Sequence, residues 1–187
     1  AAPETLIPTW SPRLWTSIAT GKEPAVHGIE NFVRYDDERR PVALYTQEDR
    51  RTKAHWNMLS EAGVTVDTIG WWMTFPVEPV DGLMVAQTNT SIDEDPDRAG
   101  PQKGVLREGV PAQVWPADQE AWVFERFAAV EAELDGTIER IFGRLEPYSE
   151  ESAERWADCR WAFRADSTYL DLALARAARP EGPADVT

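Results

Sequence analysis

The first half of the chain alternates short apolar stretches with residues that favour turns. This pattern predicts two helices and two strands, in the order helix 12–20, helix 48–62, strand 64–72 and strand 82–87. Gly63 separates the second helix from the strand that follows it, and this order of helix, glycine and strand is typical of a parallel crossover. Residues 30–47 are charged and interrupted by proline, which predicts a solvated loop.

The second half repeats its apolar positions with the period of a helix. Two long helices are predicted, over 118–145 and 149–178, because Pro147 interrupts the pattern between them. The apolar positions of the second helix predict its buried side, formed by Trp156, Cys159, Phe163, Leu170 and Leu174. The two halves together predict an α/β fold, in which helices flank a partial, mainly parallel sheet and a helical excursion fills the C-terminal half.

Length and charge narrow the classes of function. The 187 residues are enough for one domain with a core, which divides into a helix and strand region at 1–87, a surface loop at 88–116 and a helical region at 117–180. A net charge of −14 argues against a nucleic-acid duplex or an anionic membrane as the main partner. No apolar run is long enough for a membrane span. Cys159 is the single cysteine, which excludes an internal disulfide and a cysteine-based metal site.

The two ends of the chain predict that it is a portion of a larger domain. It starts without an initiator methionine or a signal peptide. Asp185-Val186-Thr187 follows a turn, as the first residues of a further strand would. A location, cytoplasmic or exported, therefore does not follow from these residues.

The stretch from Ser11 to Ile29 carries the clearest candidate chemistry. Ser11-Pro12 is typical of a helix start, where a serine caps the first turn and where anions also bind. Thr20-Gly21 then ends the helix, and His27-Gly28 follows a turn. From spacing alone, Ser11 is interpreted as a helix cap and His27 as a hydrogen-bonded structural histidine.

An acidic segment has the spacing of a calcium loop. Asp93, Asp95 and Asp97 stand at the intervals of the first ligands of an EF-hand. Arg98 and Gly104 replace the glycine and the glutamate that such a loop requires. The segment is therefore interpreted as a solvated acidic turn rather than a metal site.

Aromatic side chains follow the end of the first predicted strand. Trp71 and Trp72 stand where open α/β sheets keep their ligands, so they either line a cleft or belong to the core. His55 lies among charged neighbours on the predicted helix 48–62 and is expected to be exposed.

The stretch SPRLWTSIATGKEPAVHGI, from Ser11 to Ile29, resembles the nucleophile region of the alkaline phosphatase superfamily, in its type I phosphodiesterase and nucleotide pyrophosphatase branch. That pattern has a Ser or Thr nucleophile, a Gly after Thr ten residues later, a Pro and then His-Gly-Ile, and all of these occur here in register. Residues 56–60, 70–76 and 82–85 resemble the next helix, strand and loop of bacterial members. Sulfatases place Pro and Arg where this chain has Arg13 and Trp15, which disfavours that branch.

The resemblance implies an alkaline-phosphatase-like fold and metal-dependent hydrolysis of phosphoric esters, with a small-molecule phosphate ester as the partner. Ser11 would then be both nucleophile and metal ligand, would form a phosphoryl-enzyme and would be activated by two divalent ions, commonly zinc. Asn31 lies one residue before the place of an asparagine that binds a phosphate oxygen in this branch. Asn31 and Trp72 are therefore the candidates for substrate binding.

The family's metal ligands come from strands ahead of the nucleophile and far downstream, and neither set is found in this sequence. We therefore expect the 187 residues alone to bind no catalytic metal and to be inactive. A non-catalytic family member that acts as a binding or scaffold module is the alternative. Phosphomonoesterase, phosphoryl transferase and sulfatase activities also stay open, because loops decide the substrate.

Overall fold

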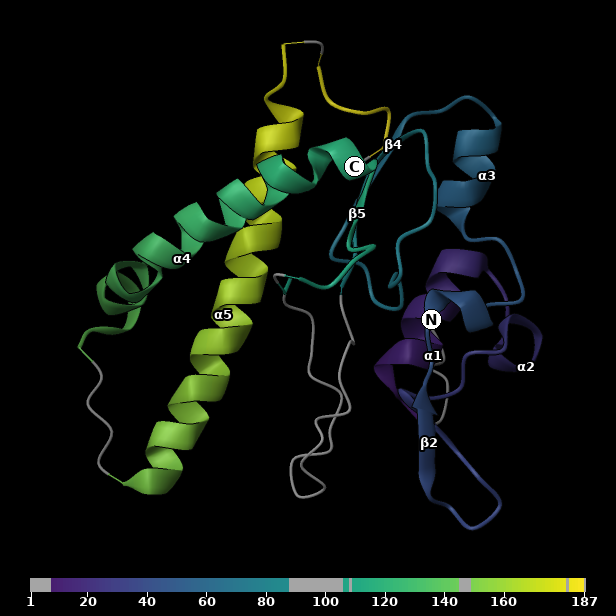
Figure 1. The fold of residues 1–187 in the computed structure, drawn as a ribbon, viewed down its shortest axis with the longest axis horizontal. Coiled ribbons are helices and arrows are strands. Elements are labelled where there is room, and N and C mark those ends of the chain that lie inside the picture. Colours follow the sequence, from purple (N-terminus) through teal and green to yellow (C-terminus); the bar gives the residue numbers. More distant parts are fainter. Residues whose placement is uncertain (1–7, 88–105, 108, 145–148, 181, 187) are drawn as a thin grey trace, which may run out of the picture.

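The central sheet has three strands and lies between two groups of helices (Figure 1). The computed structural model describes residues 8–87, 106–107, 109–144, 149–180 and 182–186. Strand β3 (Val66–Ile69) pairs in parallel with β4 (Gly82–Val85), which pairs antiparallel with β5 (Val114–Trp115). Val186 adds a parallel bridge to Val66, so the expected entry of residues 185–187 into the sheet is confirmed at Val186.

The two faces of the sheet are covered by different helices, because side chains alternate along each strand. Met84 packs with residues of the N-terminal region, in which α1 (Ser11–Thr20), α2 (Pro24–His27) and α3 (His55–Glu61) lie. Leu83 and Val85 point the other way and pack against α4 (Glu120–Phe142) and α5 (Glu150–Ala177). The short 3-10 turn η2 (Ala117–Gln119) leads from β5 into α4. The predicted α/β architecture is confirmed.

Two N-terminal predictions require correction. The helix predicted over 48–62 begins only at His55, after the 3-10 turn η1 (Gln47–Asp49). Arg50 explains the later start of this helix. Its guanidinium donates to the Thr52 carbonyl and to the Asn57 side chain, and these two hydrogen bonds hold the intervening residues in a non-helical conformation.

Residues 30–47 form a hairpin, not a loop. Strand β1 (Val33–Tyr35) pairs with β2 (Pro41–Leu44), and the acidic run between them makes the turn. Asp36 closes that turn by accepting hydrogen bonds from the Arg40 main chain and side chain.

The C-terminal helices occur as predicted, but α5 turns a different side inward. Leu170 and Leu174 are about 60% exposed, and Cys159 is exposed as well. The buried positions are Ala165, Thr168, Leu172 and Arg176. The predicted side is therefore wrong, because Leu172 packs against the sheet and Arg176 forms an ion pair with it, and these contacts set the rotation of the helix.

That ion pair joins Arg176 of α5 to Asp67 of β3. Two guanidinium N–H groups donate to the two carboxylate oxygens, at 2.8 and 2.7 Å. Asp67 also accepts the Leu83 amide at 2.9 Å, and its side chain is fully buried. Burying a charge is costly unless it is paired, so this contact fixes the end of α5 against the sheet.

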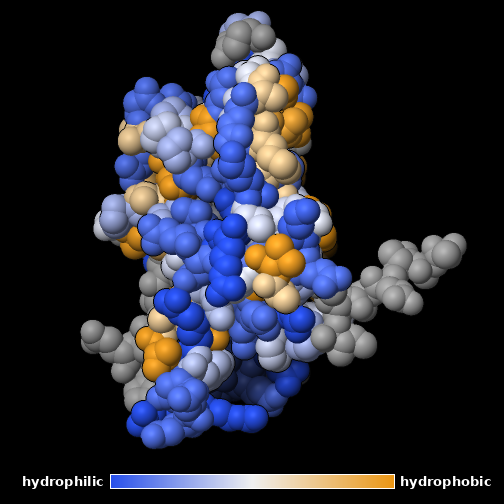
Figure 2. Space-filling model, turned by 90° about the vertical axis from the view of Figure 1, so that its right-hand side faces the viewer, coloured by the Kyte–Doolittle hydropathy of each residue, from blue (hydrophilic) through white to orange (hydrophobic). Residues whose placement is uncertain are grey.

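The outer surface is mostly polar. On the face that carries α2 and α3, apolar side chains gather only in separate small patches (Figure 2). Within the described ranges, no helix is both long and apolar enough to cross a membrane. The acidic segment with Asp93, Asp95 and Asp97 lies outside the described residues.

Candidate functional site

Helix α1 ends where the sequence predicts, at Thr20-Gly21. Gly21 adopts φ +64°, a conformation that glycine reaches without strain, and its N–H donates to the Ser17 carbonyl at 2.8 Å. The Thr20 hydroxyl donates to the Thr16 carbonyl at 2.7 Å and accepts the Lys22 amide at 3.2 Å. Local backbone chemistry therefore explains why threonine and glycine stand together at this point.

His27 fastens the following turn to α1. Its Nδ1 accepts the Ile29 amide at 3.1 Å, which places the ring proton on Nε2. Nε2 then donates to the Ser17 hydroxyl at 3.0 Å. The ring is fully buried, and this burial lowers the pKa of His27 from its ordinary value, although the Arg13 carbonyl raises it in part. The prediction of a hydrogen-bonded structural histidine is confirmed.

The lowered pKa of His27 gives a pH dependence with a definite sign. Below pH 6.5, the ordinary histidine pKa, the unfolded chain takes up a proton that the folded chain refuses. We expect the free energy of unfolding to fall by up to about 1.4 kcal/mol per pH unit between pH 6.5 and the lowered pKa of the folded state. Urea unfolding at pH 7.5, 6.5 and 5.5 measures this slope.

His27→Gln should remove that part of the slope, and His55→Gln is the matched control. Equal slopes in the wild type and His27→Gln would show that another group causes the pH dependence.

Ser11 begins α1 but does not cap it. The first helical hydrogen bond runs from the Leu14 amide to the Trp10 carbonyl, so Trp10 holds the cap position and the cap interpretation is wrong. Ser11 is half-buried, and among the described residues its hydroxyl has no hydrogen-bond partner. Thr16, the other candidate hydroxyl on this helix, is 3% exposed. Ser11 is therefore the more accessible hydroxyl, and it lies at the positive end of the helix dipole.

Aromatic contacts bring the turn after β3 against α1. Trp15, one helical turn beyond Ser11, makes an edge contact with Trp71 at 5.0 Å between ring centroids. Trp71 also packs against the core beneath α1 and α3. Ser11 and Trp15 share one side of the helix, so Ser11 lies one turn from the start of the Trp71-Trp72 segment.

Phe32, which follows Asn31 in the chain, packs against Trp72. Phe32 contacts the Trp72 ring at 5.5 Å between centroids, and the Phe32 amide donates to the Asn31 side-chain oxygen at 2.7 Å. Asn31 and Trp72 are both half-buried. Among the described residues, no hydrogen bond or ring contact joins either of them to Ser11. The structure thus brings Trp72 against Phe32, the chain neighbour of Asn31, and brings Trp71 against Trp15 on the helix that Ser11 begins.

Thr74 holds this segment against the sheet. Its buried hydroxyl donates to the Trp71 carbonyl at 2.7 Å and accepts the Gln87 amide, just past β4, at 3.1 Å. Met73, between Trp72 and Thr74, has φ +63°, which is strained for a residue with a side chain. A strained turn held by a buried hydroxyl gives Trp71 and Trp72 fixed positions.

The sequence did not reveal every residue of this neighbourhood. Phe32 and Thr74 become visible only through their contacts, because their partners are far away along the chain. His55 is half-buried between Trp56 and Trp71 and not exposed, since its ring packs edge-on against both indoles. Within the described part of the chain, no three His, Cys, Asp or Glu side chains come together as a possible metal site.

The mixed α/β architecture, with a small sheet flanked by helices, is consistent with an alkaline-phosphatase-like fold. The profile of the family described as Type I phosphodiesterase / nucleotide pyrophosphatase matches residues 1–172. The chain belongs to this family, whose members are generally metal-dependent. No curated protein and no solved structure matches the chain.

Proposed function

We propose that this chain contributes the nucleophile and part of the substrate site to a metal-dependent phosphodiesterase or nucleotide pyrophosphatase. The observation that supports this proposal best is the accessible position of Ser11 at the start of α1. Gly21 ends this helix, and His27 ties the following turn to it through Ser17. Family membership supports hydrolysis of a phosphoester. The positive end of α1 favours an anionic substrate there.

Ser11 would act by nucleophilic substitution at phosphorus. Its Oγ forms the new P–O bond, the bond to the leaving alcohol breaks, and the hydroxyl proton departs with that alcohol. Water then cleaves the phosphoryl-serine and restores the hydroxyl. Asn31 would donate from its side-chain amide to a phosphate oxygen, and Trp72 would contact the organic part of the ester.

The metal requirement of the family is not met by the described residues, because they bring together no suitable group of donors. We therefore propose that the ligands of two divalent ions, with zinc as the expected metal, come from residues outside the 187, and that these residues alone are inactive. No step of the mechanism above is assigned to a metal.

A comparison of two polypeptides tests the proposal. The natural full-length polypeptide and the 187-residue chain are assayed with bis-p-nitrophenyl phosphate, p-nitrophenyl phosphate and p-nitrophenyl sulfate, and their metal content is measured. We expect turnover of the diester, bound zinc in the longer polypeptide only, and lower rates with the monoester and the sulfate.

Turnover by the 187 residues with stoichiometric zinc would overturn the assignment of outside ligands. A full-length polypeptide without turnover or metal would instead support the alternative, a non-catalytic binding or scaffold module. Preference for the monoester or the sulfate would change the reaction class but leave the nucleophile in place.

A further inference from the structure

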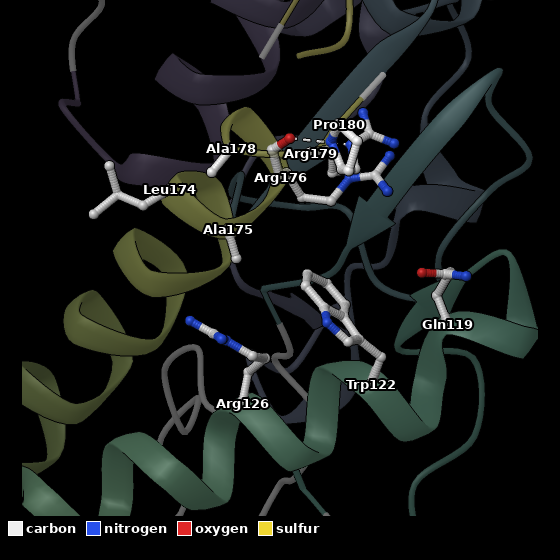
Figure 3. A pocket seen from close by; sticks show the side chains of 9 residues that line it. All are labelled: Gln119, Trp122, Arg126, Leu174, Ala175, Arg176, Ala178, Arg179 and Pro180. Carbon is white, nitrogen blue, oxygen red and sulfur yellow. Dashed lines mark hydrogen bonds between the residues drawn. The ribbon is translucent and has the colours of Figure 1, made fainter. Parts of the chain in front are cut away.

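A concave site lies between the start of α4 and the end of α5. The cavity measures about 820 Å³, and its lining comes from Gln119, Trp122 and Arg126 on one side and from residues 174–176 and 178–180 on the other. Trp122 and Arg126 project from α4 toward the last turns of α5 (Figure 3). Asp67 anchors this end of α5 at the beginning of β3, whereas Trp71 and Trp72 follow its end, so the cavity is separate from the site around Ser11.

The lining of this cavity is rich in arginine, although the chain as a whole is acidic. The sequence has 33 acidic against 19 basic residues, yet three arginines and no acidic residue stand among the described residues of the lining. Arg126 lines the cavity from α4, and Arg176 and Arg179 line it from the end of α5 (Figure 3). Asp171 and Asp67 pair with these arginines from outside the lining, so the cavity offers cationic hydrogen-bond donors rather than a large positive field.

Two of these arginines keep donors available for a ligand. A guanidinium has five N–H groups, and Arg176 uses only Nε and one Nη on Asp67. Arg126 likewise uses Nε and one Nη, on Asp171. Within the described ranges, the remaining Nη of each has no partner. The Asp67 and Asp171 carboxylates hold the two guanidinium groups in fixed planes, so the remaining N–H groups are oriented to donate to an oxyanion.

The remaining lining is apolar and would contact the body of the ligand. Trp122 offers an indole ring, and Leu174, Ala178 and Pro180 continue the apolar wall. Leu174 is 61% exposed, so this wall is open to a ligand from solvent. We propose that the cavity binds an organic oxyanion, such as a carboxylate, that is attached to an aromatic or apolar group.

Calorimetric titration of the 187-residue chain with 1-naphthoate tests this proposal, with uncharged 1-naphthamide as the matched ligand. We expect saturable binding of naphthoate, with a dissociation constant below about 1 mM, and at least tenfold weaker binding of the amide. The indole N–H resonance of Trp122, assigned through Trp122→Phe, should shift with naphthoate.

Arg126→Gln should weaken naphthoate binding about tenfold, because it removes one charged donor. Its carboxylate partner is 30% exposed, so the fold tolerates the change, which circular dichroism verifies. Arg155→Gln is the control, on α5 with a side chain 77% exposed. Absence of saturable binding, equal binding of the amide, or equal affinity in the two variants would each overturn the proposal.

Discussion

Arg176→Met is expected to lower the free energy of unfolding by about 3–5 kcal/mol. The substitution removes both short hydrogen bonds of the fully buried Asp67 carboxylate to Arg176. Among the described residues it leaves Arg179, whose Nη lies 3.5 Å from the carboxylate, as the one remaining ionic partner. Breaking a buried pair on one side costs this much because the remaining charge stays desolvated. Urea unfolding, with the wild-type dependence on denaturant concentration, measures the loss.

Arg126→Met is the matched control. Its pair with Asp171 has the same two-bond geometry, but the two side chains are 38% and 30% exposed. Water stabilises the carboxylate left behind, so we expect a loss below about 1 kcal/mol.

The double variant Asp67→Asn with Arg176→Met should recover at least half of the loss, because Asn still accepts the Leu83 amide and carries no charge. Equal losses in the two single arginine variants would mean that burial does not determine how much each ion pair contributes to the free energy of unfolding.

This ion pair also explains which part of the fold could be predicted. The C-terminal end of α1 and the turn at His27 follow from rules that act over a few residues, namely the positive φ of Gly21 and a ring that bonds the Ile29 amide. The rotation of α5 does not, because Arg176 pairs with a residue 109 positions away. A periodic apolar pattern cannot show that a charged position faces inward.

The features of the candidate site also divide into those that the sequence predicted and those that it did not. The register of Ser11 with Thr20-Gly21 and His27-Gly28 identified the family, and the profile match confirms it. The contact of Phe32 with Trp72 could not be predicted from the sequence, because it depends on how the turn after β3 packs against the loop after α2. The cap at Trp10 was also missed, since the chain enters the helix one residue earlier than a serine–proline pair indicates.

Ser11→Ala is expected to reduce kcat for the phosphodiester by about 10³-fold or more in the natural full-length polypeptide. The nucleophilic oxygen is lost, and no other hydroxyl on α1 replaces it. Thr16 is 3% exposed, the Ser17 hydroxyl is bonded to His27, and the Thr20 hydroxyl is bonded to the Thr16 carbonyl. Steady-state kinetics with bis-p-nitrophenyl phosphate measures the effect. Bound zinc and unfolding midpoints, measured alongside, distinguish loss of the nucleophile from loss of the metal or of the fold.

Two substitutions make this result specific. Ser11→Thr keeps a hydroxyl at the same backbone position, so it should retain activity within about a hundredfold, and rapid quenching should trap a phosphorylated residue 11 in it and in the wild type. Ser60→Ala removes a hydroxyl that only accepts the Asp81 amide at 2.9 Å, at the surface, and should leave kcat unchanged. Full turnover in Ser11→Ala, with the phosphoryl group trapped on another residue, would show that Ser11 is not the nucleophile. In that case the Ser11 hydroxyl would only position the helix, and its removal would leave the covalent intermediate intact.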